Sequence, residues 1–133
     1  MSAGYSGTPL ARKLGIKAGT RALFLGVPEE VLEEIAPLPD DSHDALLSDL
    51  DFVLVFYTES KEYREGMPLL KSNLKKDGMI WVAWPKKAAK TTSDMDGNFV
   101  RIYGLECGLV DTKVCAFNET WSGMKFMYRK TDR

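Results

Sequence analysis

Two fully apolar runs constrain the fold of this 133-residue sequence more than any other feature. Phe52 to Tyr57 and Met79 to Trp84 lack the alternation of apolar and polar residues found in a strand with one face in water. Each run is therefore predicted to be a central strand of a parallel sheet. The segment between them starts at Ser60 and has apolar residues at helical spacing, although Pro68 should kink or restart that helix. Strand, helix and strand make a βαβ unit.

The flanking segments extend this unit on both sides. Arg21 to Leu25 is a short apolar strand, and Pro28 is well placed to open a helix behind it. Asp40 to Asp51 fits a helical turn and a short edge strand equally well. Val110 to Phe117 and Met124 to Tyr128 read as a closing hairpin. The sequence therefore predicts one Rossmann-like α/β domain over residues 1–133, a three-layer sandwich with a mostly parallel sheet and an antiparallel C-terminal hairpin at its edge.

Composition narrows the range of partners and sites. The chain has 18 basic and 19 acidic residues, so its formal charge of -1 provides no overall field for nucleic acid or an anionic membrane. No apolar run is long enough to span a bilayer, and the N-terminus does not resemble a signal peptide, so we expect a cytoplasmic protein. The chain has one histidine, His43, and two cysteines, Cys107 and Cys115, which lie among apolar residues. Because a metal site needs several such ligands close together, the sequence predicts no metal site.

The predicted sheet selects one place for a ligand. In open α/β sheets, ligands bind outside the carboxyl ends of the parallel strands. That rule selects four loops, here called the rim: Gly26–Pro28, Thr58–Ser60, Pro85–Lys87 and Asn118–Gly123. Helix N-termini, lysines and hydroxyl groups in these loops suit a small anionic ligand better than an apolar one.

The leading interpretation is a binding module for a small anionic metabolite or nucleotide, without covalent chemistry of its own. Lys86 and Lys87 would supply charge, Thr58 and Ser122 hydrogen bonds, and Trp121 a stacking face. Each also has a structural interpretation: paired lysines are commonly solvated, and a hairpin tryptophan commonly packs across strands.

Two other functions remain open from the sequence. One is a diverged transferase, in which Glu119 acts as general base. The other is a protein-interaction domain that forms a homodimer along an exposed edge strand, Met124 to Tyr128.

The order of the elements, ending in a strand and hairpin, resembles the later half of class I methyltransferases. Leu74 to Ile80 is similar to the turn that precedes the fifth strand of those enzymes. Their glycine-rich cofactor loop would fall at Phe24 to Glu29, where only Gly26 remains and Pro28 removes a backbone donor. The sequence therefore predicts no cofactor, and it argues against S-adenosylmethionine.

A second resemblance covers nearly the whole chain. Its motifs are Gly4 to Leu10, Trp81 to Lys87, Gly108 to Asp111 and Glu119 to Gly123. These segments resemble an uncharacterised bacterial family known as domain of unknown function 3052. The resemblance implies a small bacterial protein with a methyltransferase-like fold, and it implies no particular activity.

Overall fold

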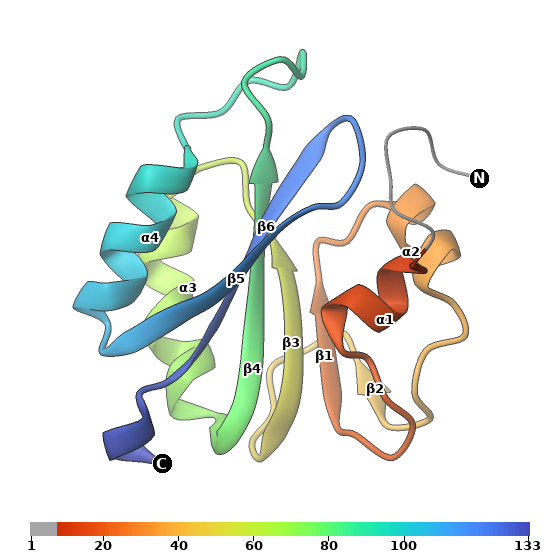
Figure 1. Ribbon diagram of the computed structural model, residues 1–133, viewed down its shortest axis with the longest axis vertical. Coiled ribbons are helices and arrows are strands. Elements are labelled where there is room, and N and C mark those ends of the chain that lie inside the picture. The colour runs from red at the N-terminus through yellow and green to blue at the C-terminus, as the bar shows by residue number, and fades with distance from the viewer. Residues whose placement is uncertain (1–7) are drawn as a thin grey trace.

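The computed structural model describes residues 8–133, which fold around a six-stranded sheet (Figure 1). The Gly4–Gly7 part of the first family motif lies outside these residues. The helices are α1 (Leu10–Leu14), α2 (Glu29–Ile35), α3 (Ser60–Ser72) and α4 (Gly97–Glu106), with a final 3-10 turn, η1 (Lys130–Asp132). The strands are β1 (Ala22–Leu25), β2 (Ser42–His43), β3 (Leu50–Phe56), β4 (Leu74–Pro85), β5 (Leu109–Ala116) and β6 (Trp121–Tyr128).

The strand order is β2-β1-β3-β4-β6-β5. Strands β2, β1, β3 and β4 are parallel, and β6 runs antiparallel to both β4 and β5. The two apolar runs form most of β3 and the second half of β4, side by side in the middle of the sheet. This confirms the predicted α/β fold with its mostly parallel sheet and antiparallel C-terminal pair.

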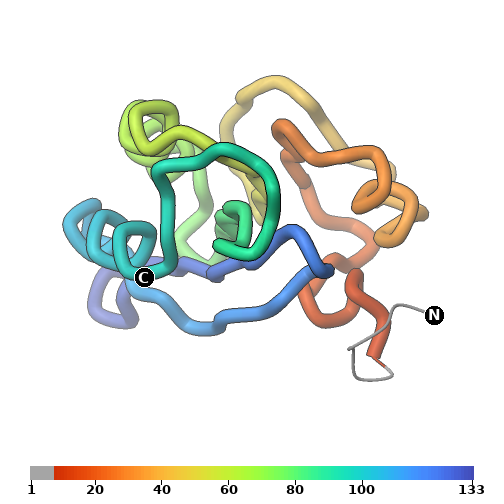
Figure 2. Tube along the Cα trace, turned by 90° about the horizontal axis from the view of Figure 1, so that it is seen from above, coloured from red at the N-terminus to blue at the C-terminus, as the bar shows by residue number. Residues whose placement is uncertain are grey.

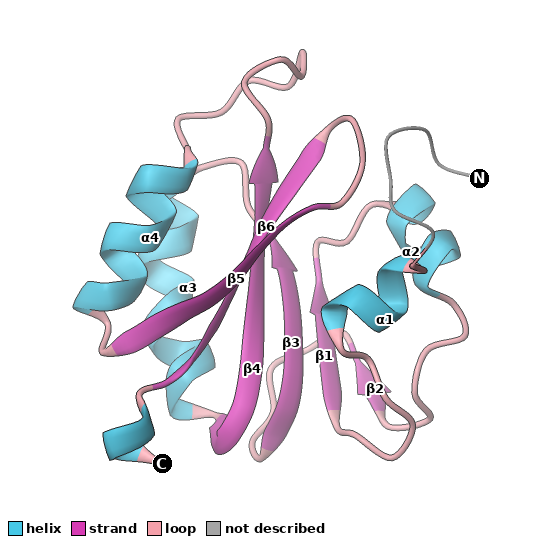
Figure 3. Cartoon of the chain, in the orientation of Figure 1, coloured by secondary structure: helices cyan, strands magenta, loops and turns pink. Residues whose placement is uncertain are grey.

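Two separate cores give the molecule three layers (Figure 3). Helices α3 and α4 cover one face of the sheet, where Tyr63 and Met67 of α3 belong to the same buried cluster as Val53 and Val82. Helices α1 and α2 cover the other face through buried leucine, valine and isoleucine side chains. Because β3 and β4 are apolar on both sides, they contribute to both cores, as the unbroken runs predicted.

The expectation that Met124 to Tyr128 forms an exposed edge strand was wrong. These residues belong to β6, which lies inside the sheet and is hydrogen-bonded to β4 and β5. Its backbone groups are therefore already paired, and a homodimer cannot extend the sheet from that segment. Strand β5 is the edge on this side of the sheet.

Two further segments bear on the sequence-based expectations: one differs from them, and the other decides between two alternatives. Helix α3 continues through Pro68 as one element. The segment that fitted a helical turn and an edge strand equally well forms the two-residue strand β2, which pairs with Ala22 and Leu23 of β1. Within residues 8–133, no helix combines the length and apolar character that crossing a membrane requires.

Candidate functional site

The four rim loops lie along one edge of the sheet. Strands β1, β3 and β4 are parallel and point their carboxyl ends to this edge. Strand β6 starts there, because Trp121 pairs with Pro85 at the end of β4. Figure 2 looks down on this edge, and the segment after β4 arches over it. The structure thus brings the β4 loop and the β5–β6 hairpin together, as the site prediction required.

Backbone hydrogen bonds hold the lysine pair beside the hairpin. The N–H of Lys86 donates to the carbonyl of Thr120 at 2.8 Å. The Asn118 side-chain oxygen accepts from the N–H groups of Thr120 and Trp121, at 2.8 and 2.9 Å, and so shapes the turn. Lys86 is half-buried, whereas Lys87 is exposed. The two ammonium groups are therefore carried by a defined backbone at the rim.

The other predicted rim residues differ in how accessible they are. Trp121 is only 9% exposed, and its ring lies edge-on to Phe56 with 4.9 Å between the ring centroids. This packing agrees with the structural interpretation of Trp121 and leaves little ring surface for a ligand. Thr58 and Ser122 are half-buried, and Glu119 is exposed on the hairpin. Whether these side chains bind a ligand or act in catalysis stays a prediction.

The segment after β4 is fastened to the start of α3. The Asp94 carboxylate accepts hydrogen bonds from the Ser60 hydroxyl at 2.6 Å and from the Ser60 N–H at 2.7 Å. The Ser93 hydroxyl donates to the Thr58 carbonyl at 2.7 Å. The Ser60 hydrogen bonds hold the pKa of Asp94 below its usual value. The lysine-bearing loop is therefore tied down at both of its ends.

We expect Asp94→Ala to release this loop. Trypsin should then cleave after Lys86, Lys87 or Lys90 about fivefold faster than in the unmodified protein, as measured by mass spectrometry. Asp77→Ala, which removes an exposed carboxylate from β4, is the matched control and should leave the cleavage rate unchanged. An unchanged rate in Asp94→Ala would show that the Ser60 contacts do not hold the loop.

The same contacts give the loop a pH dependence with a defined sign. Because the pKa of folded Asp94 lies below its unfolded value, its contribution to stability is complete at neutral pH. That contribution should disappear as the pH falls from about 4 through the lower folded pKa. Faster amide hydrogen exchange of the loop over this range, relative to the intrinsic exchange rate at each pH and with no such change in Asp94→Ala, would be the expected result.

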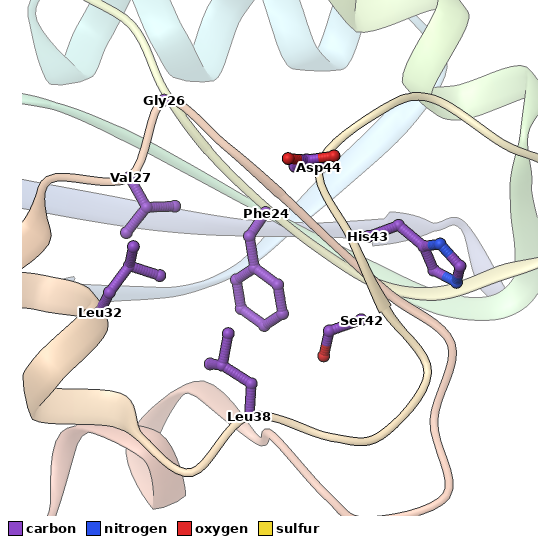
Figure 4. A pocket seen from close by; sticks show the side chains of 8 residues that line it. All are labelled: Phe24, Gly26, Val27, Leu32, Leu38, Ser42, His43 and Asp44. Atoms are coloured by element: carbon purple, nitrogen blue, oxygen red, sulfur yellow. The ribbon is translucent and has the colours of Figure 1, made fainter.

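A cavity of about 550 Å³ opens at the carboxyl ends of β1 and β2, at the other end of the same edge (Figure 4). Its lining residues come from β1, the β1–α2 loop, α2, the α2–β2 connection, β2 and the residue that follows β2: Phe24, Gly26, Val27, Leu32, Leu38, Ser42, His43 and Asp44. Figure 4 shows the Phe24 ring at the centre, with Leu32 and Leu38 on one side and Ser42 on the other. The cavity is within the usual size range for a small-molecule site.

Gly26 forms part of the cavity wall and requires glycine for two reasons. Its φ of +64° lies in the left-handed region, which side chains other than glycine rarely adopt. A Cβ atom at this position would lie 3.2 Å from the Phe56 carbonyl oxygen. The conformation and the closeness of β3 therefore both favour glycine at this point of the cavity wall.

The polar side of the cavity is at the end of β2. Asp44 directly follows β2 and is exposed. His43 contacts the Asp41 carboxylate through Nε2, and Arg21 donates to the same carboxylate at 3.1 Å. These hydrogen bonds, from His43 first and then Arg21, lower the pKa of Asp41. Arg21 and His43 are therefore already engaged with Asp41, whereas Asp44 lines the cavity.

Most residues that line this cavity were not predicted from the sequence. Only Gly26 and Val27 were part of a predicted rim loop, because β2 was not assigned and the position of Asp44 stayed unknown. One signal was present in the sequence: Asp44 follows Gly26 by about 20 residues, the spacing at which Rossmann-type sites place a ribose-binding acid. Within residues 8–133, no three histidine, cysteine or acidic side chains group as a metal site.

Sequence comparisons leave the family open. No family model matches the chain, and no curated protein matches it either. Membership of the uncharacterised bacterial family therefore stays a prediction.

Structural comparisons all lead to one class of fold. A S-adenosylmethionine-dependent methyltransferase from Aquifex aeolicus aligns over 89% of this chain and 87% of its own, with 16% identity and a TM-score of 0.64. Magnesium protoporphyrin IX methyltransferase from Synechocystis, solved with S-adenosylhomocysteine, aligns over 84% and 75%, with 9% identity and a TM-score of 0.57. LepI, solved with S-adenosylmethionine, aligns over 90% of this chain but 39% of its own, with 11% identity and a TM-score of 0.55. The chain thus has the Rossmann-like fold of these methyltransferases.

These neighbours contradict the prediction that no cofactor is involved. Two of them hold S-adenosylmethionine or S-adenosylhomocysteine, so the fold points to the cofactor that the sequence argued against. The error came from counting glycines in the β1–α2 loop. Within that loop of the structure, only Gly26 has a left-handed φ, and the loop still borders a cavity of about 550 Å³.

Proposed function

We propose that this chain binds S-adenosylmethionine or S-adenosylhomocysteine through the adenosyl half, in the cavity at the ends of β1 and β2. One observation carries the proposal: Gly26 and Asp44 border one cavity at the carboxyl ends of neighbouring parallel strands. That is where Rossmann-type folds hold a nucleoside. The structures of LepI and of magnesium protoporphyrin IX methyltransferase, each solved with S-adenosylmethionine or S-adenosylhomocysteine, support the same assignment.

The lining residues fit the chemistry of an adenosyl group. Phe24, Leu32 and Leu38 give an apolar surface for the flat base. The Asp44 carboxylate can accept hydrogen bonds from both ribose hydroxyl groups. Gly26 lets the ligand approach the backbone without meeting a side chain.

The other three rim loops, Thr58–Ser60, Pro85–Lys87 and Asn118–Gly123, supply a second region at the same edge. When bound, S-adenosylmethionine provides an electrophilic methyl group on its sulfonium. We propose that Lys86 and Lys87, with the hydroxyl groups of Thr58 and Ser122, hold an anionic group of the molecule that receives this methyl. Glu119 stays the proposed base for an acceptor that must lose a proton. The cytoplasmic location also stays a prediction.

Calorimetric titration with S-adenosylhomocysteine tests the proposal. Asp44→Ala should weaken binding about 10- to 100-fold, because hydrogen bonds to a charged group contribute about 1.5 to 3 kcal/mol. Asp40→Ala removes an exposed carboxylate of the same segment that does not line this cavity, and it should bind as the unmodified protein does. Absence of binding at millimolar ligand, or equal affinity in Asp44→Ala, would refute the proposed site.

A further inference from the structure

The segment that builds the cavity is strongly acidic although the whole chain is almost neutral. Residues 22–60 contain β1, α2, β2 and β3 and have no lysine or arginine. Their ten acidic residues are Glu29, Glu30, Glu33, Glu34, Asp40, Asp41, Asp44, Asp49, Asp51 and Glu59. By contrast, Lys86, Lys87 and Lys90 follow β4 at the other end of the edge. Asp41 is paired with Arg21 and Asp51 with Lys75, so the segment keeps an excess of negative charge that the net charge of the chain conceals.

The residues at the start of α2 disfavour the binding of a phosphate there. Rossmann-type folds usually place a phosphate at the helix N-terminus that follows the first strand, where free N–H groups receive it. Here the N-cap residue is Pro28, which has no N–H, and the first turn carries Glu29 and Glu30. Both glutamates are exposed and lie between Val27 and Leu32, which line the cavity. A phosphate at this helix end would lose one donor and face two carboxylates.

Among residues 8–133, no lysine or arginine lines the cavity. Arg21 and His43 both contact Asp41 and are held by that carboxylate. Within residues 8–133, no ion pair involves Glu29, Glu30 or Asp44. Asp44 therefore adds its charge to the field of the two glutamates.

We infer that the cavity accepts a nucleoside whose 5′ substituent carries no phosphate and excludes 5′-phosphates, with Glu29 and Glu30 as the residues that set this specificity. The inference rests on the proposed function and deepens it. If Asp44 holds the ribose, the 5′ carbon points to the start of α2, as in other folds of this type. A neutral or cationic 5′ group, such as a thioether or sulfonium, is compatible with that place, whereas AMP, ADP and dinucleotides are not.

The experiment compares adenosine with AMP in the full chain by calorimetry at low ionic strength. The unmodified protein should bind adenosine at least about tenfold more tightly than AMP, and the preference should shrink at high salt because the charges are exposed. In a Glu29→Lys, Glu30→Lys double variant, the preference should fall about tenfold or reverse. Glu65→Lys with Glu106→Lys is the matched control: it makes the same charge change on α3 and α4, on the other face of the sheet, and should keep the original preference.

Each outcome has a separate meaning. If adenosine binds and AMP binds equally well, the inference is wrong and the proposed site stands. An unchanged preference in the double lysine variant also overturns it, because the two glutamates would then not set the specificity. If adenosine does not bind at all, the proposed site itself fails, and the inference fails with it. Circular dichroism of both double variants shows whether they have folded.

Discussion

Trp81→Ala should lower the free energy of unfolding by about 3 to 5 kcal/mol, the largest stability effect that we expect from a single substitution in this chain. Trp81 lies in β4 and is fully buried, and the centroid of its ring is 5.8 Å from that of the Phe117 ring. Its indole N–H donates to the Leu14 carbonyl at 2.8 Å and so ties α1 to the sheet. Alanine would leave a cavity and an unsatisfied carbonyl at once.

Urea unfolding measures this effect, and two further variants separate its causes. Trp81→Phe keeps an aromatic ring but removes the N–H, so its cost should be smaller, about 1 to 3 kcal/mol. Val114→Ala, at a side chain that is 62% exposed, should stay within about 0.5 kcal/mol of the unmodified protein. If Trp81→Ala behaved like Val114→Ala, α1 would not be anchored through this residue.

Gly26→Val should reduce affinity for S-adenosylhomocysteine about 100-fold or more, the largest effect that we expect on binding, because it combines strain with obstruction. Valine is disfavoured at a φ of +64°, and its Cβ would lie 3.2 Å from the Phe56 carbonyl oxygen. Because Gly26 lines the cavity, a backbone shift that relieves this clash would change the cavity wall. Calorimetric titration measures the loss.

Gly19→Val separates obstruction from backbone strain. Gly19 has a φ of +82°, but a Cβ there would meet no atom within 4 Å, and the residue does not line this cavity. Both variants should lose stability from the unfavourable φ, on the order of 1 to 2 kcal/mol. Only Gly26→Val should lose the ligand. Equal affinities in the two variants would place the ligand away from the β1–α2 loop.

Much of the architecture follows from local patterns in the sequence. Phe52 to Tyr57 and Met79 to Trp84 predicted buried parallel strands because side chains on both faces of each run are apolar. The sheet rule then grouped loops that the structure does bring to one edge, since Lys86 lies next to the β5–β6 hairpin. These inferences held because each depends on residues within a single element or on the direction of parallel strands.

The candidate cavity depended on contacts that no local pattern encodes. Strand β2 has two residues and exists only because it pairs with β1, so no periodicity indicated it or placed Asp44 beside Gly26. The position of β6 between β4 and β5 also came from long-range pairing, which is why the edge expected at Met124 to Tyr128 was wrong. The sequence alone thus determined the fold class and the buried central strands, and it predicted an edge of the sheet for a ligand. Only the tertiary structure decided which residues meet there, because strand order and side-chain proximity arise from contacts between distant segments.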